Sequence, residues 1–276
     1  MSGLDKRRTF WPGKERRENI NQHVLKRSWT ELNEKIETPR KIDIAHSTSR
    51  ISLPVHIAKL DKSPWQDYVR LLNICRGGQI TVAYSSSRSQ KLVAISEIPN
   101  CSREQLRALR PALHENIVGF TAAYFLDPSI YLVYELMPVS LIGILNTPLG
   151  PLQVEEIATV CQSVFRGIHF VHEQLGVMIG DLTAETVLVA RNGVVKLANI
   201  GKVALAGSEK TLRRDVDAAG LILVRMLEPD TGMLFPKLLQ LQRPSSCDAN
   251  ARDLIAGLNL LSTEDILKLR FSKKKL

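Results

Sequence analysis

The chain has 276 residues, 44% of them hydrophobic, and a formal net charge of +9 at pH 7. This apolar content suffices for a sizeable core and excludes a wholly disordered chain. No apolar run reaches the roughly 18 residues that a membrane helix needs, and residues 1–14 lack the apolar centre of a signal peptide, so we expect no membrane span.

The cysteines show none of the close spacing that is typical of zinc sites or disulfide frameworks. They are Cys75, Cys101, Cys161 and Cys247. We therefore expect no metal site and an intracellular protein, of the cytoplasm or the nucleus.

Residues 1–62 are expected to form a basic, partly helical N-terminal extension. Residues 1–70 hold 15 Lys and Arg against 9 Asp and Glu, a net +6, and Lys273-Lys274-Lys275 adds three charges, so the body is nearly neutral. The basic arm suits either an acidic partner, such as nucleic acid or an anionic surface, or a solvated tail that aids solubility; we favour the tail. Apolar spacing predicts a helix over residues 20–36, whose apolar face must be covered by the body or by a partner, and a short strand over 51–55.

The following segment, up to residue 137, is predicted to be an antiparallel sheet with one inserted helix. Turn residues separate runs of strand-forming residues, and Ser102 is a good helix N-cap. The predicted strands are residues 68–74, 81–84, 92–97, 118–125 and 130–136, and the helix is 102–112.

The rest of the chain is predicted to be mostly helical. One apolar stripe at helical spacing runs through residues 154–171. Strands at 187–189 and 194–197 flank Asn192-Gly193, a strong hairpin signal. Further helices are predicted over residues 214–227, 249–258 and 263–269.

This order of elements and motifs resembles the protein kinase fold over residues 65–270. The colinear series is Val93-Ala94-Ile95, His114-Glu115-Asn116-Ile117-Val118, Tyr131-Leu132-Val133-Tyr134-Glu135, Asp181-Leu182, Asn199-Ile200-Gly201 and Asp215-Val216. The resemblance implies an α+β, two-lobe, kinase-like domain over residues 63–272, with a small antiparallel N-lobe at about 65–137, a mostly helical C-lobe at about 138–272 and a shortened activation segment.

The catalytic positions that the resemblance implies have largely lost their chemistry. The lysine that holds the ATP phosphates is replaced by Ser96, and the glutamate that pairs with it by Gln105. The magnesium-binding aspartate is Asn199, and the second metal ligand, an asparagine in the family, is Thr186. Thr183 stands where a lysine would steady the transferred phosphate.

Asp181 keeps the position of the catalytic base. With no held γ-phosphate to act on, we expect a remnant whose main role is hydrogen bonding within its own loop. The glycine-rich loop is similarly reduced: two of its three glycines are replaced, by Cys75 and Ile80, and we favour a plain hairpin turn at Gly77-Gly78 over a phosphate loop.

Apolar positions, in contrast, are retained. Leu109, Phe120, Ile179 and Ile200 match the column that joins the two kinase lobes. The residues that the resemblance places around the nucleotide cleft are Val82, Ala94, Tyr134, Glu135, Met137 and Leu188.

The sequence supports three functional hypotheses. The first is a catalytically inactive kinase-like scaffold or regulator (a pseudokinase) that binds a protein partner, with no cofactor required and at most weak, magnesium-independent ATP binding. The second is an atypical ATP-dependent kinase or transferase that uses Asp181, with Lys91 or Lys202 as a substitute cation. The third is a nucleic-acid or anionic-surface binder acting through the basic arm. We lean away from an enzyme.

Overall fold

The computed structural model describes residues 58–87, 90–109, 112–148, 151–206, 213–229, 239, 241–247 and 249–258. The helices expected over residues 20–36 and 263–269 and the strand expected over 51–55 lie outside the described residues. Among the described residues, no helix combines the length and the apolar character needed to cross a bilayer.

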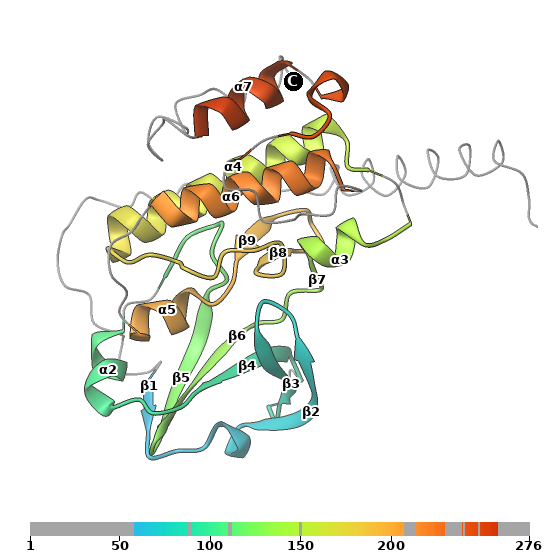
Figure 1. Cartoon of the computed structure of the whole chain (residues 1–276). Coiled ribbons are helices and arrows are strands. Elements are labelled where there is room, and N and C mark those ends of the chain that lie inside the picture. The colour runs from blue at the N-terminus through green and yellow to red at the C-terminus, as the bar shows by residue number, and fades with distance from the viewer. Residues whose placement is uncertain are drawn as a thin grey trace, which may run out of the picture. The chain divides into compact units, whose positions relative to one another are not determined.

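The first half of the described chain forms a sheet with one α-helix (Figure 1). Its elements are β1 (Ala58–Leu60), η1 (Pro64–Gln66), β2 (Tyr68–Cys75), β3 (Gln79–Ser85), β4 (Leu92–Ile98), α2 (Arg103–Ala108), β5 (Phe120–Leu126) and β6 (Ser129–Glu135).

The strands pair in the order β1-β5-β6-β4-β3-β2. The predicted strands at residues 68, 81, 92, 118 and 130 are confirmed to within two residues at each end. The pairings β2–β3, β3–β4, β4–β6 and β5–β6 are antiparallel. Ala94 lies opposite both Val82 and Tyr134, so these three side chains share one face of the sheet.

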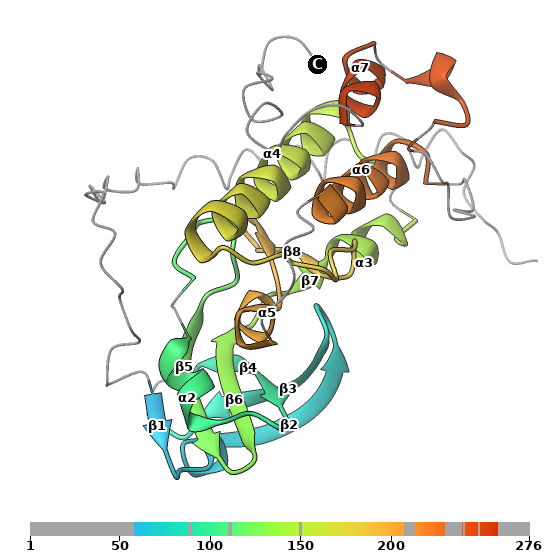
Figure 2. The ribbon, with the colours of Figure 1, turned by 60° about the vertical axis from the view of Figure 1, so that its left-hand side comes forward.

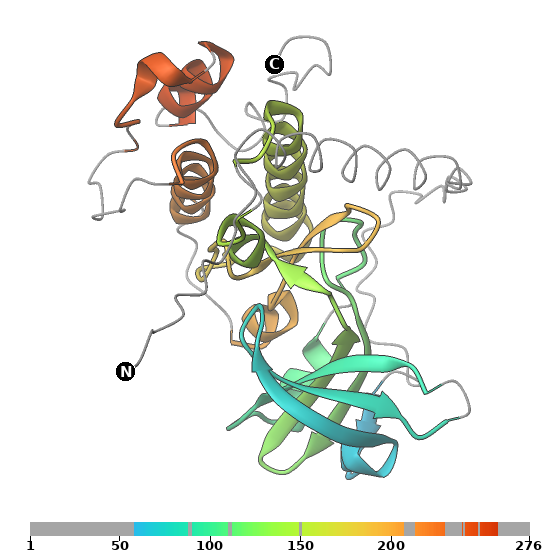
Figure 3. The ribbon, with the colours of Figure 1, turned by 90° about the vertical axis from the view of Figure 1, so that its right-hand side faces the viewer.

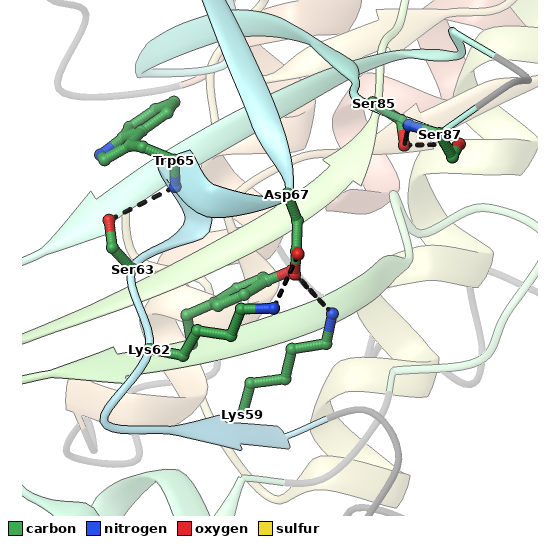
Figure 4. Close-up of polar contacts among 8 residues, drawn as sticks. Lys59, Lys62, Ser63, Trp65, Asp67, Ser85 and Ser87 are labelled. Carbon is green, nitrogen blue, oxygen red and sulfur yellow. Dashed lines mark hydrogen bonds and ion pairs between the residues drawn. The ribbon is translucent and has the colours of Figure 1, made fainter.

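β1 is an addition that the sequence did not predict, and it runs parallel to β5. It lies N-terminal to residue 63, where the kinase-like domain was expected to begin. An acidic side chain holds it in place (Figure 4): Asp67 accepts hydrogen bonds from Lys59 and Lys62, each at 2.7 Å, and from the Tyr124 hydroxyl at 2.7 Å. Partial burial raises the pKa of Asp67, but these three donors outweigh it and hold that pKa well below its usual range.

The inserted helix is shorter than predicted. Ser102 caps α2 as expected, but the helix ends at Ala108 rather than at residue 112. Leu109 leaves the helical region, with ψ at 127°, and its side chain is buried. The sequence carries a proline at position 111, which disfavours the predicted continuation of the helix to residue 112.

The second half of the described chain is mainly helical (Figures 1 and 2). Its elements are β7 (Val139–Ser140), α3 (Leu141–Leu145), α4 (Val154–Phe170), η2 (Val171–Leu175), β8 (Val187–Val189), β9 (Val195–Leu197), α5 (Ile200–Ala206), α6 (Arg213–Leu227), η3 (Pro244–Ser246) and α7 (Ala249–Leu258). The predicted hairpin and the predicted helices at 154, 214 and 249 are confirmed, whereas α3 and α5 were not predicted.

The apolar stripe of α4 is buried as its spacing predicted. Ile157, Val160, Val164, Phe165 and Ile168 are each at most 7% exposed and belong to the core that α6 and α7 complete. Figure 2 shows α4 and α6 side by side, with α5 between them and the sheet. A second core lies between the inner face of the sheet, α2 and α5.

Backbone hydrogen bonds join the two halves. Asn116 accepts from the Leu197 amide at 2.8 Å, and the Val118 amide donates to the Leu197 carbonyl at 2.9 Å. The Asn116 side chain also donates to the Val195 carbonyl at 2.9 Å. The segment between α2 and β5 is therefore hydrogen-bonded to β9 of the helical half.

Candidate functional site

The predicted nucleotide cleft is reduced to a small cavity. Its volume is about 20 Å³, roughly the space of one or two water molecules. Of the six residues expected to line the cleft, five border this cavity and Val82 does not. Those five are Ala94, Tyr134, Glu135, Met137 and Leu188. Val82 is instead buried in the sheet beside Ala94, at 7% exposure.

The turn between β2 and β3 forms one wall of this cavity. Figure 3 shows this hairpin reaching from the sheet to the helical half. Arg76, Gly77 and Ile80 all line the cavity. The Arg76 guanidinium donates to the Met137 carbonyl at 3.0 Å, and the Gly77 amide donates to the Glu185 carbonyl at 3.1 Å.

Glycine is required at both turn positions. Gly77 and Gly78 have φ of 64° and 108°, which L-residues with side chains seldom adopt. A Cβ atom on Gly77 would lie 2.7 Å from the Cβ of Ala198, and one on Gly78 would lie 2.9 Å from the Nδ2 of Asn199. Gly77-Gly78 is thus a hairpin turn that lies directly against the residues at the end of β9.

Ser96 is buried in the sheet, and Gln105 forms hydrogen bonds that stabilise α2. Ser96 lies in β4 opposite Leu132 and is 7% exposed. The Gln105 side chain accepts from the Ser102 amide at 2.7 Å and so completes the capping box of α2. It also donates to the Leu205 carbonyl at 3.3 Å, which fixes α2 to α5.

The loop that carries Asp181 is stabilised by Thr186. The Thr186 hydroxyl lies 3.1 Å from the carbonyls of Asp181 and Thr183 and accepts from the Thr183 amide at 2.9 Å. The Asp181 residue is exposed, and within the described residues its carbonyl, rather than its carboxylate, forms the loop contact. The expected hydrogen bonding within this loop is therefore made by the backbone of Asp181.

A buried aspartate anchors this loop through hydrogen bonds. Asp215, at 0% exposure, accepts from the amides of Ile179 and Gly180 at 2.7 and 2.9 Å, and its carboxylate lies 2.8 Å from Nε2 of His172. Gly180 has φ of 77°, a conformation that glycine adopts without strain. The sequence placed Asp215 at the start of a helix but did not reveal this anchoring role.

The resemblance assigns Asn199 to the position of the magnesium-binding aspartate. Its φ of 66° lies in the left-handed region, where asparagine is one of the better-tolerated side chains. Its amide group lies against Gly78 and borders the cavity. Ile200, the next residue, is fully buried and begins α5.

The residues present do not fit the magnesium nucleotide that the fold implies. The Thr186 hydroxyl is used by its own loop, and Asn199 carries no charge. The cavity that Asn199 borders has a volume of only about 20 Å³.

The column that the resemblance placed between the lobes is buried at every position. Leu109, Phe120, Ile179 and Ile200 are 1%, 7%, 4% and 0% exposed. Leu109 and Phe120 belong to the core under the sheet, and Ile179 and Ile200 to the helical core. Lys196 adds an ion pair with Glu135 at 2.5 Å, between β9 and the end of β6.

Tyr134 lies in β6 and lines the cavity. Its hydroxyl is buried and has no hydrogen-bond partner among the described residues. Burial raises the pKa of this phenol well above its usual value. A Cβ atom on Gly201 would lie 2.6 Å from that hydroxyl, so Tyr134 packs directly on the start of α5.

Replacing Tyr134 with phenylalanine is expected to stabilise the protein. Removal of an unpaired buried hydroxyl should raise the free energy of unfolding by about 1 kcal/mol, or about 2–4 °C in Tm. Thermal unfolding followed by circular dichroism measures this shift. The control is Tyr131→Phe, which deletes a hydroxyl that donates to Glu97 at 3.0 Å and should not stabilise. A lower Tm for Tyr134→Phe would show that the hydroxyl has a partner.

Comparison with known proteins agrees with this architecture. A family model described as "Protein kinase domain" matches residues 76–221, more than half of the 276 residues. The chain is 33% identical over 102 residues to the serine/threonine-protein kinase Tao of Drosophila melanogaster. It is 28% identical over 153 residues to human cyclin-dependent kinase 9, and 23% identical over 181 residues to the serine/threonine-protein kinase PAK 5 of Rattus norvegicus.

These matches cover 37%, 49% and 63% of this chain and 10%, 41% and 25% of the respective relatives. The chain thus spans less than half the length of each of these three relatives. The residues that the family model matches, 76–221, include the β2–β3 turn and the Asp181 loop, which the structure brings together. With the family model covering more than half of its residues, the chain belongs to the protein kinase domain family.

Proposed function

We propose that this protein is a catalytically inactive member of its family that acts by binding another protein. One observation carries the proposal: the side chains at the positions for ATP and magnesium are buried or contact other parts of the protein. Ser96 is buried in the sheet, Thr186 stabilises its own loop, and Asn199 lies under the β2–β3 turn. Phosphoryl transfer depends on positioning and on charge at these positions, so their joint loss removes its physical basis.

Asp181 alone does not supply an activity. A general base contributes about 10²–10⁴-fold, and only when the reacting groups are held in place. A single transition-state charge is worth about 10³–10⁵-fold in phosphoryl transfer. Three missing groups therefore outweigh the one that remains.

The intact packing supports a binding role. Both cores are complete around the column of Leu109, Phe120, Ile179 and Ile200, as expected for a chain whose function needs the fold. The name of one relative, cyclin-dependent kinase 9, refers to a protein partner. The cysteines are free, which is compatible with a reducing compartment, the cytoplasm or the nucleus.

A phosphotransfer assay tests the proposal. The purified chain is incubated with radiolabelled ATP, Mg²⁺ or Mn²⁺ and a general protein substrate, in parallel with Asp181→Ala. We expect equal, background signals from both proteins. Turnover in the wild type that is lost in Asp181→Ala would overturn the proposal and favour an enzyme of altered mechanism.

That second candidate, an atypical kinase or transferase, is favoured by the exposed Asp181 residue. It requires a cation in place of the lysine lost at Ser96, and Lys91 and Lys202 are both exposed. If either residue serves in this way, Lys91→Ala or Lys202→Ala should abolish the turnover just described. Without such turnover, this candidate has no support.

A further inference from the structure

We infer that the β2–β3 turn, residues 76–78, is an internal strap that occupies the nucleotide cleft and holds it closed. The strap stands where a bound nucleotide would otherwise join the two halves of the domain. The inference rests on the proposed function, because it concerns the same cleft. It adds that the cleft is closed, which a protein without catalytic activity need not be.

The contacts of the strap reach three separate parts of the chain. Its strands belong to the sheet, Arg76 binds the carbonyl of Met137 in the segment after β6, and Gly77 binds the carbonyl of Glu185 in the Asp181 loop. Met137 is 3% exposed, so its carbonyl would lose a partner in a nearly buried setting if the strap opened. The closed arrangement is therefore favoured by two hydrogen bonds, one from Arg76 and one from Gly77.

The packing under the strap is just as specific. Gly77 is buried and lies against Ala198 and Leu188, and Gly78 lies against Asn199. Ile80 stands where the family has a third glycine, and its side chain lines the cavity. Ile80, at a glycine position of the phosphate loop, and Asn199, at the magnesium position, thus both border the same cavity as the strap.

The strap lowers the affinity of the cleft for small molecules. A ligand that needs the open cleft binds with its intrinsic affinity reduced by the open fraction. Two hydrogen bonds of ordinary net strength correspond to an open fraction of about 1%, and so to affinity about 100-fold weaker. Opening the strap should recover part of that factor for a ligand that uses only the apolar walls.

Three variants separate the strap from general damage. Gly77→Ala places a Cβ 2.7 Å from the Cβ of Ala198 and prevents the turn from seating, and Arg76→Ala removes the bond to Met137. The matched control is Gly119→Ala, because a Cβ there has no atom within 4 Å. Circular dichroism verifies that each variant is folded.

The probe is fluorescent mant-adenosine, which carries no phosphate and so does not depend on the missing lysine or on a metal. We expect Gly77→Ala and Arg76→Ala to bind it at least tenfold more tightly than the wild type and Gly119→Ala. Equal affinities in all four proteins would overturn the inference.

Hydrogen exchange of the wild type gives a test that needs no variant. The Gly77 amide is expected to be protected at least 100-fold relative to an unstructured peptide, because Glu185 accepts its hydrogen bond. Exchange at the unprotected rate would overturn the strap. Tight nucleotide binding by the wild type without phosphotransfer would also overturn it and leave the proposed function standing, whereas phosphotransfer would remove the proposed function itself.

Discussion

Replacing Asp215 with alanine is expected to lower the free energy of unfolding by about 3–5 kcal/mol. The carboxylate is fully buried, accepts two backbone hydrogen bonds and contacts His172. Its loss leaves the amides of Ile179 and Gly180 without an acceptor in the interior, where an unpaired donor costs about 1–3 kcal/mol. Urea unfolding followed by tryptophan fluorescence measures the change.

The control for this prediction is Asp217→Ala, two residues along the same helix. Asp217 is exposed and pairs with Arg213 at 2.9 Å across one helical turn, an interaction worth about 0.3–0.5 kcal/mol. We expect little change in the urea midpoint for this variant. If both variants lose the same stability, Asp215 is not the anchor of the Asp181 loop.

Replacing Gly201 with alanine is expected to destabilise the protein by about 1–3 kcal/mol, although alanine is the better helix former. The new Cβ would lie 2.6 Å from the Tyr134 hydroxyl and 2.7 Å from Cδ1 of Leu132. Both neighbours are buried and cannot move aside freely. The start of α5 would have to shift away from the sheet, and thermal unfolding should register the strain.

A double-mutant cycle identifies the cause of that loss. Tyr134→Phe deletes one of the two atoms in conflict, so Gly201→Ala should cost less in the phenylalanine background than in the wild type. Gly119→Ala, where a Cβ has open space, should stay within about 0.5 kcal/mol of the wild type. Equal costs in both backgrounds would place the strain at Leu132 or in the helix itself.

The sequence predicted elements whose signals are local. The stripe of α4, the Asn192-Gly193 hairpin and the Ser102 N-cap of α2 depend on neighbouring residues, and all three are present. β1 and α5 were missed because their stability comes from distant partners. β1 is three residues long and depends on β5 and Asp67, and α5 packs against Gln105 of α2.

The candidate site, too, could be predicted from the sequence only in part. The resemblance supplied the positions of Ser96, Thr186 and Asn199, and residue chemistry alone showed what each cannot do. It could not show what each does instead, because the partners of Thr186 and the contact between Asn199 and Gly78 are set by backbone conformation. The Arg76–Met137 bond joins residues 61 positions apart, and no local pattern could predict it.

The hydrogen bonds between Asn116, Val118 and Leu197 bear on how the domain unfolds. Two halves connected by a flexible hinge can lose structure one after the other, each with its own transition. Here the segment leading into β5 is bonded to β9, so the sheet cannot separate from the helical half without breaking these backbone hydrogen bonds. The described unit is therefore expected to melt as one cooperative block, and a destabilising change in either half should lower the stability of the other.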